Sequence, residues 1–302
     1  MLVEIAICTW NRSGLLKQTL QSLCSLNIPA SVEWQVLVVD NNSSDDTSAV
    51  IESMSDSLPI VSLFEASQGH TIARNAAVRH AQGDLLLWTD DDCKFNPDWL
   101  ANYCREFENS KFDFWGSTIT PEFISGKTPE WISENWDICK GCFASRDLGS
   151  QKIELTADGL PYGANFAVRT AIQKQYPFDE SLGRQGSRVT GEDELDFMRR
   201  LLKAGHQGLW VPDNPIQHLI EPDRATPEYV YNYYLGQARH QPPQHSKWKL
   251  WLTANWNYLM YKVKQGRKPS NEWLSHLVQS ALAQGQLKRG STGLINHASR
   301  VH

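Results

Sequence analysis

The stretch Asp84-Leu85-Leu86-Leu87-Trp88-Thr89-Asp90-Asp91-Asp92 is the part of the chain on which the fold prediction depends. Its apolar portion has the length of a buried strand and is too short for a typical helix. The three carboxylates that follow would repel one another in a dry place, and such groups usually need a cation. In an open α/β sheet, ligands bind beyond the carboxyl ends of the strands. The stretch therefore predicts a divalent cation site in a ligand crevice, with a solvated acidic turn as the alternative.

The residues around this stretch alternate between strand-like and helix-like patterns. The spacing of apolar residues predicts strands at 3–8, 34–40, 60–64 and 84–89, and helices at 14–26, 45–54, 71–81 and 97–109. Further strands are expected at 112–120, 166–169 and 209–211, and a further helix at 192–204. This order predicts an α/β fold with a mostly parallel central sheet, right-handed crossovers and flanking helices.

Composition limits the class of protein. The chain has 302 residues, 41% of them hydrophobic, which predicts one large domain or one and a half, with a proper core. A net charge of -5 without a long basic run argues against nucleic acid as a partner. No stretch reaches the ~18 apolar residues of a membrane span, and no signal peptide is evident, so a cytoplasmic location is expected. The six cysteines are scattered, and free thiols are expected; Cys139 and Cys142 have the spacing of only half a zinc site.

The alternation of strand-like and helix-like segments ends near residue 226. Helices are expected at 227–239, 248–264 and 270–288, rich in tyrosine, tryptophan and lysine. We therefore divide the chain into a domain at 1–225 and a helical C-terminal extension at 226–302. The extension could pack on its own domain, on a second copy in a homodimer, or on an anionic membrane surface. Ordinary packing is favoured, because apolar stripes on helices are usually core.

Five stretches, taken together and in this order, resemble the family 2 glycosyltransferases with the GT-A fold. They are Thr9-Trp10-Asn11-Arg12, Val39-Asp40-Asn41-Asn42-Ser43 through Thr47, Gln68-Gly69 with Ala73-Arg74-Asn75, Asp90-Asp91-Asp92, and Gly191-Glu192-Asp193. The resemblance covers residues 3–225. It implies transfer of a sugar from a nucleotide diphosphate-sugar to an acceptor hydroxyl, with inversion at the anomeric carbon. It also implies a nucleotide-sugar-binding half at 1–110 and an acceptor-binding half at 111–225.

The resemblance implies a metal site and a nucleotide site. A hard cation, Mn or Mg, would stabilise the charge that develops on the departing diphosphate. Asp92 is the expected direct ligand, with Asp90 and His218 as further ligands; Asp90 or Asp91 would instead hold the ribose or a metal-bound water. The expected nucleotide-sugar contacts are Thr9, Asn11, Arg12, Asp40, Asn42, Gly69, Arg74, Asp90 and Asp91.

The acceptor hydroxyl must lose a proton as the new bond forms, which a carboxylate within hydrogen-bond reach can accept. The resemblance assigns this role to Asp193 of the Glu192-Asp193 pair. A helix cap is the other interpretation of this pair. Gly163, Asn165 and Trp131 are the expected acceptor contacts.

One departure from the family pattern concerns the product. The Gln-x-x-Arg-Trp motif of polymerising members is absent, and Phe197-Met198-Arg199-Arg200 stands in its place. We therefore expect a hexosyltransferase that adds single sugars, with UDP as the commonest donor nucleotide and a glycan or lipid-linked acceptor in glycan or polysaccharide biosynthesis. A lipid-linked acceptor would bring the enzyme to the inner face of the membrane. The competing interpretations are a nucleotidyltransferase that makes sugar nucleotides and a non-catalytic carbohydrate-binding relative.

Overall fold

The computed structural model describes residues 1–182, 193–240, 242–268 and 270–288. The chain forms two compact units. The first contains residues 1–126, 143–182 and 193–220, and the second contains residues 127–142 and the described residues from 221 onward. Glu192, expected beside the catalytic base, lies outside the described residues.

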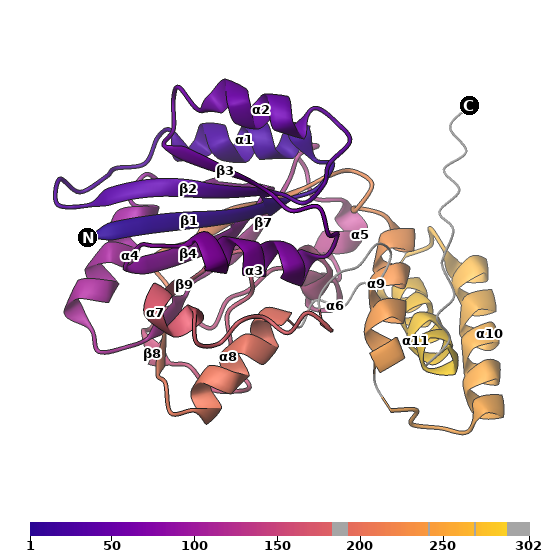
Figure 1. Cartoon of the computed structure of the whole chain (residues 1–302). Helices are drawn as coiled ribbons and strands as arrows, with labels where there is room; N and C mark the ends of the chain where they lie inside the picture. Colours follow the sequence, from indigo (N-terminus) through magenta and orange to yellow (C-terminus); the bar gives the residue numbers. More distant parts are fainter. Residues whose placement is uncertain (183–192, 241, 269, 289–302) are drawn as a thin grey trace. The chain divides into compact units, whose positions relative to one another are not determined.

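The first unit is built on a large, mainly parallel sheet with the strand order β3-β2-β1-β4-β9-β6-β10-β8 (Figure 1). The strands β1, β2, β3 and β4 run parallel to one another, whereas β9 and β8 are antiparallel to their neighbours. The strands are β1 (Leu2–Thr9), β2 (Glu33–Asp40), β3 (Ile60–Phe64), β4 (Leu85–Asp90), β6 (Phe114–Gly116), β8 (Ile153–Glu154), β9 (Phe166–Arg169) and β10 (Gly208–Trp210).

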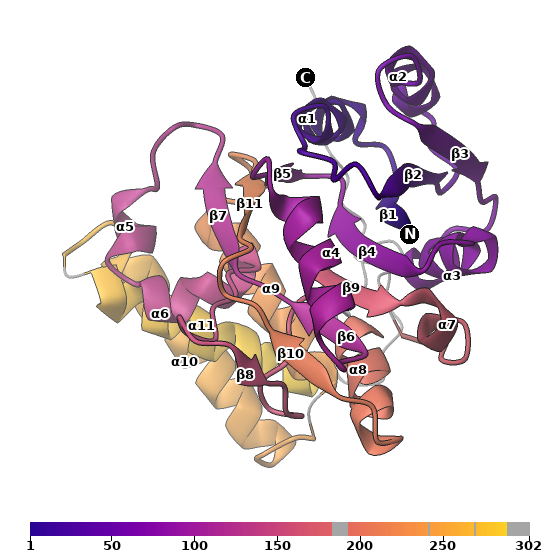
Figure 2. The ribbon, with the colours of Figure 1, turned by 90° about the vertical axis from the view of Figure 1, so that its left-hand side faces the viewer.

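Helices cover both faces of this sheet, so its central strands are apolar on both sides. On β1, Ile5 and Ile7 face one core cluster and Ala6 faces the other, which is the alternation that a strand imposes. Viewed toward the edge of the sheet, α1 and α4 lie on one side and α3 on the other (Figure 2). The helices are α1 (Ser13–Leu23), α2 (Thr47–Met54), α3 (His70–His80), α4 (Trp99–Asn109), α7 (Thr170–Gln173) and α8 (Asp193–Lys203).

The single strand expected at 112–120 is wrong. The segment instead forms β6 in the large sheet and β7 (Ile119–Phe123) in a second sheet, which has the order β5-β11-β7 with β5 (Cys93–Phe95) and β11 (Ile216–Ile220). The break follows Gly116, where a Cβ atom would lie 2.1 Å from the Pro161 ring. The chain therefore passes close to Pro161 there and changes sheets, which an apolar pattern alone does not reveal.

The second unit is helical. Its segments are α5 (Glu130–Ser133), α6 (Trp136–Cys139), the short 3-10 helix Lys140–Phe143 that ends at the unit boundary, α9 (Pro227–His240), α10 (Lys247–Lys264) and α11 (Ser270–Leu287). Trp131 of α5 packs against Trp273 of α11 with ring centroids 5.5 Å apart, and the Asn135 amide donates to the Ser270 hydroxyl at 2.8 Å. The short helices and the C-terminal helices thus share one core.

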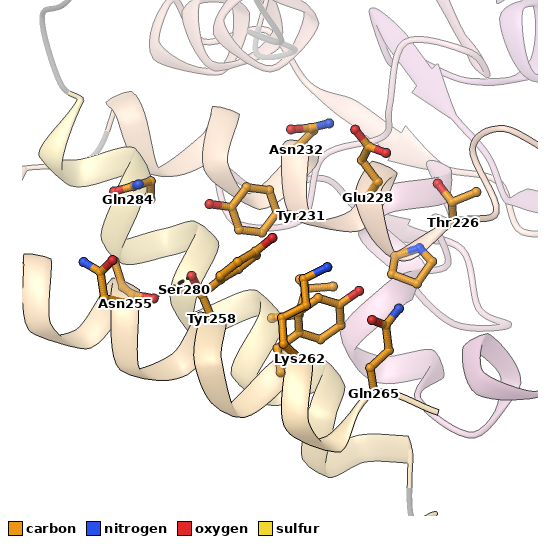
Figure 3. A pocket seen from close by; sticks show the side chains of 14 residues that line it. Thr226, Glu228, Tyr231, Asn232, Asn255, Tyr258, Lys262, Gln265, Ser280 and Gln284 are labelled. Carbon is orange, nitrogen blue, oxygen red and sulfur yellow. Dashed lines mark hydrogen bonds between the residues drawn. The ribbon is translucent and has the colours of Figure 1, made fainter. Parts of the chain in front are cut away.

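A cavity of about 690 Å³ lies among α9, α10 and α11 (Figure 3). Tyr231, Tyr258 and Tyr261 line it together with amide side chains such as Asn255 and Gln284. Within the part of the chain that the structure describes, no helix combines the length and apolar character that crossing a bilayer requires.

The sequence favours free thiols over a zinc site at Cys139 and Cys142. Cys139 and Cys142 are buried free thiols, and burial raises the pKa of Cys139 to about 12. A thiol must lose its proton to bind zinc, so this environment disfavours metal ligation. Among the described residues, the one group of His, Cys, Asp and Glu side chains close enough to hold a metal ion lies elsewhere, at Asp90, Asp92 and His218.

Candidate active site

The carboxyl ends of three neighbouring parallel strands bring the first site residues together. Thr9, the last residue of β1, pairs in register with Asp40 of β2, and Cys8 pairs with Asp90 of β4. The Thr9 hydroxyl donates to Oδ2 of Asp91 at 2.8 Å. Sequence-distant polar residues thus meet at the edge of the sheet where α/β proteins bind ligands.

The loops that follow β1 and β2 hold each other in place. Asn11 and Asn42 adopt left-handed backbone angles, with φ of 52° and 63°, which asparagine tolerates better than most residues. Oδ1 of Asn11 accepts from the Ser44 amide at 2.7 Å, and Oδ1 of Asp40 accepts from the Ser43 amide at 2.9 Å. These bonds fix the two loops before any ligand arrives.

The cationic side chain of Arg12 faces part of the acid triplet. Nη1 and Nη2 of Arg12 contact Oδ1 of Asp91 at 2.5 Å and Oδ2 of Asp92 at 2.6 Å. Burial raises the pKa of Asp91 to about 7 against the opposing effect of the Arg12 charge. The Arg12 guanidinium therefore offsets part of the repulsion expected within the triplet, across Asp91 and Asp92.

A donor set for a metal ion remains beside this pair. His218 of β11 pairs in register with Cys93, and the Leu219 amide donates to the Asp92 carbonyl at 2.7 Å, so sheet pairing places His218 next to Asp92. Nε2 of His218 lies 3.1 Å from Oδ1 of Asp92. Ligand atoms of Asp90, Asp92 and His218 lie within 4.8 Å of one another.

The chemistry of these donors fits a divalent ion. Nδ1 of His218 is buried and has no hydrogen-bond partner among the described residues. Two carboxylates and an imidazole suit Mn²⁺, and the carboxylates alone would suit Mg²⁺.

Arg74 joins the strand ends to the expected base. Its guanidinium is buried, with centroids of the Trp88 and Phe178 rings 5.6 Å and 5.2 Å from Cζ. Nη1 contacts Oδ2 of Asp193 at 2.8 Å, and Nη2 lies 3.9 Å from Oδ1 of Asp90. One side chain of α3 thus contacts both acidic groups, so Asp90 and Asp193 belong to one site.

Asp193 and Glu194 are neighbours whose pKa values shift in opposite directions. Burial would raise the pKa of Asp193, but Arg74 and His70, whose Nδ1 is 3.4 Å from Oδ2, hold it well below its ordinary value. Burial and the Asp193 charge raise the pKa of Glu194 to about 7. Asp193 is therefore ionised at neutral pH, while Glu194 is near its midpoint. Opposed shifts of this kind are common in active sites.

Two of the expected residues shape the site through their backbone. The Gly69 amide, just before α3, donates to Oδ1 of Asn41 at 2.8 Å, which links the third loop to the second. The Gly163 amide donates to Oε1 of Glu194 at 3.3 Å. A Cβ atom on Gly163 would lie 2.3 Å from Nη2 of Arg74, so only glycine leaves room for this guanidinium.

The structure places the other two expected acceptor residues differently. Asn165 is fully buried. Its Oδ1 accepts from Trp99 and Tyr103, and its Nδ2 donates to the carbonyl groups of Thr118 and Asn214. Because the whole amide is used inside the core, Asn165 is a packing residue and is not an acceptor contact. Trp131 belongs to the second unit, where it packs against Trp273.

Sequence reasoning missed His70 and Glu194. Both stand directly beside residues of the recognised stretches, since His70 follows Gly69 and Glu194 follows Asp193. Their positions in sequence were the only available signal. Their roles depend on contacts with Asp193 and Arg74 that folding creates.

Comparison with known proteins agrees with this geometry. The model of glycosyl transferase family 2 matches residues 4–163. The succinoglycan biosynthesis protein ExoM of Rhizobium meliloti is 32% identical over 230 residues, which are 74% of this chain and 69% of that protein. The glycosyltransferase AglE of Haloferax volcanii is 28% identical over 70% of this chain and 64% of that protein. The chain therefore spans about two thirds of the length of these relatives.

Solved structures show the same fold. The mannosyltransferase PcManGT from Pyrobaculum calidifontis, in complex with GDP-Man and Mn²⁺, has a TM-score of 0.58 at 17% identity, covering 94% of this chain and 72% of that one. TarS 1-349 of S. aureus, in complex with UDP-GlcNAc, has a TM-score of 0.55 at 16% identity, covering 95% and 91%.

The sheet topology and the similarity to these solved structures show that the chain has the GT-A fold. With the family match over residues 4–163 and the similarity to ExoM, it belongs to glycosyl transferase family 2.

Proposed function

We propose that this glycosyltransferase transfers a single hexose from a nucleotide diphosphate-sugar, with UDP as the nucleotide, to a hydroxyl group of a glycan or lipid-linked acceptor. The reaction inverts the anomeric carbon and depends on Mn or Mg. We place it in glycan or polysaccharide biosynthesis, in the cytoplasm, at the inner face of the membrane when the acceptor is lipid-linked. ExoM, a succinoglycan biosynthesis protein, supports a polysaccharide role.

The observation that carries the proposal is the shared Arg74. It lies 2.8 Å from Asp193 and 3.9 Å from Asp90, so a carboxylate base and the acids that would face the diphosphate belong to one site. In our proposal Asp193 accepts the proton of the acceptor hydroxyl as the sugar bond forms. An ionised carboxylate with a low pKa is a weak base. A bound diphosphate would compete with Asp193 for Arg74, and Asp193 would then be more basic in the donor complex than in the free protein.

Asp90, Asp92 and His218 would hold the metal ion. When bound, the ion would supply Lewis acidity toward the diphosphate leaving group. The proposed nucleotide-sugar contacts remain Thr9, Asn11, Arg12, Asp40, Asn42, Gly69, Arg74, Asp90 and Asp91. The proposed acceptor contact is the Gly163 backbone. The fixed loops after β1 and β2 support this assignment, because a preformed site loses less entropy on binding.

The first test uses Asp193→Asn. This variant keeps the shape of the side chain and removes the base, so we expect sugar transfer to fall by about 10²–10⁴-fold while nucleotide binding persists. Release of nucleoside diphosphate is measured with UDP- and GDP-sugars and a panel of glycan acceptors, and nucleotide binding is measured by calorimetry.

The matched control is Asp196→Asn on the same helix, where Asp196 forms a half-exposed pair with Arg200 at 2.8 Å. It should keep parental turnover. Unchanged turnover in Asp193→Asn would remove this residue from the mechanism. Release of pyrophosphate from a nucleoside triphosphate and a sugar phosphate would instead favour a nucleotidyltransferase.

A further inference from the structure

The helix α10 is apolar on two opposite sides. Leu250, Ala254 and Tyr261 are buried on one side, within the second unit. On the other side Trp248, Trp251 and Trp256 remain 61%, 58% and 62% exposed, and Leu252, Leu259 and Val263 are also exposed. These six residues lie on one side of the helix at helical spacing, and we call them the tryptophan stripe. Large exposed apolar patches usually mark a binding surface.

The stripe is distinct from the cavity of the second unit. Tyr258 and Lys262 of α10 line that cavity (Figure 3), whereas none of the six stripe residues is among its lining residues. Among the described residues of the unit, no side chain covers the stripe, whose members remain exposed.

The charge around the stripe has one sign. Between Glu228 and Glu272 every Asp, Glu, Lys or Arg in the sequence is basic, although the whole chain has a net charge of -5. Lys264 and Lys268 pair with Glu272 and Glu130. The remaining basic side chains near the stripe are exposed, and they are Lys247, Lys249, Lys262 and Arg267.

The positive charge favours one of the two partners that could cover the stripe, an anionic lipid surface rather than a second copy of the chain. In a symmetric dimer through α10, the same patch of each subunit meets its copy. Lysines would then face lysines, and the helix offers no acid to pair with them. An anionic lipid surface supplies the opposite charge, and tryptophan is favoured at the boundary between lipid headgroups and acyl chains.

We propose that α10 is an interfacial helix that docks the protein on an anionic phospholipid membrane, with the tryptophan stripe inserted at the acyl boundary and the flanking lysines among the headgroups. The helix lies in the plane of the membrane rather than across it. This docking is a property of the second unit and does not depend on the transfer reaction.

The experiment is vesicle sedimentation with the full chain. We expect binding to phosphatidylcholine vesicles that contain phosphatidylglycerol, little binding to pure phosphatidylcholine, and weakening in high salt. The triple variant Trp248→Ser, Trp251→Ser and Trp256→Ser should bind at least about tenfold more weakly. Lys247→Glu with Lys249→Glu should lose the preference for anionic lipid.

The matched control is Phe64→Ser with Ile153→Ser, which removes exposed apolar side chains of the first unit and should leave vesicle binding unchanged. Donor hydrolysis, measured without lipid, should be the same in all these variants. The proposal is overturned if the parent ignores anionic vesicles, or if the tryptophan and control variants bind equally. It is also overturned if the parent is a lipid-independent dimer that the tryptophan substitutions convert to a monomer.

Discussion

At the scale of single residues, the site depends on how one buried guanidinium is shared by two buried carboxyl groups. Arg74 contacts Oδ2 of Asp193 at 2.8 Å and lies 3.6 Å from Oε2 of Glu194. One guanidinium cannot fully offset two adjacent buried carboxylates, because each loses hydration on burial. The pKa of Asp193 is therefore lowered and that of Glu194 is raised. The proton that Glu194 keeps lets Asp193 stay ionised.

The raised pKa of Glu194 predicts that the effect of Glu194→Gln on stability depends on pH. The Glu194 carboxyl has an ordinary pKa of 4.5, and its pKa in the folded protein is about 7. Between these pH values the folded state keeps a proton that the unfolded state has released, so stability falls as the pH rises. Glutamine has no such proton. We expect Glu194→Gln to be more stable than the parent by about 1–3 kcal/mol at pH 8, with this advantage lost at pH 4.5.

Urea unfolding at the two pH values measures this difference. Glu33→Gln, at an exposed position at the start of β2, is the control and should change stability little at either pH. A stability difference between Glu194→Gln and the parent that does not vary with pH would show that the Glu194 carboxyl titrates normally.

At the scale of elements, glycine allows a close helix crossing in the second unit. A Cβ atom on Gly285 of α11 would lie 2.5 Å from the Leu235 carbonyl oxygen and 2.7 Å from Cβ of Ala238, both on α9. These atoms belong to backbone or to a rigid Cβ, so they cannot rotate away. The two helices can approach this closely only because the position has no side chain.

We therefore expect Gly285→Ala to force α9 and α11 apart and to destabilise the second unit by about 1–3 kcal/mol. This outcome runs against the usual gain in helix propensity from glycine to alanine. Gly14→Ala in α1 is the matched substitution, because its Cβ would meet nothing within 4 Å, and it should be neutral or slightly stabilising. Hydrogen exchange of the α9 and α11 amides reports the effect, and equal protection in both variants would contradict the close crossing.

At the scale of the whole molecule, ligand binding should be visible as stability. A ligand that binds only the folded chain stabilises it by about 2.7 kcal/mol at a hundred times its Kd. We expect UDP together with Mn²⁺ to raise the thermal midpoint more than either alone, and EDTA to remove both this shift and the sugar transfer. Restoring Mn²⁺ or Mg²⁺ should recover both.

The variant Asp92→Asn, which lacks one proposed ligand, should lose the metal-dependent part of the shift. Asp56→Asn removes an exposed carboxylate and should retain it. A full nucleotide shift and full activity in the presence of chelator would show that the Asp90, Asp92 and His218 group does not serve as a metal site.

Residue patterns were enough to predict the α/β fold class. Local periodicity predicted β3 at Ile60–Phe64 and β9 at Phe166–Arg169 with their observed bounds, because a strand records its burial in alternating or continuous apolar residues. It also placed acids at the ends of β2 and β4, and the parallel register joined them at one edge. The five recognised stretches indicated the family, which the comparisons confirm.

Which partners those residues contact depends on how the elements assemble. The contacts of Arg12 with Asp91, and of Arg74 with Asp193, join side chains 79 and 119 positions apart. The side-chain amide of Asn165 is buried in the core, where it forms hydrogen bonds with residues 47–66 positions away. Such pairings depend on how strands and helices assemble, whereas periodicity reports only on each segment. For the same reason, the apolar residues of α10 predicted ordinary packing, and only the assembled unit shows that one face of the helix stays exposed.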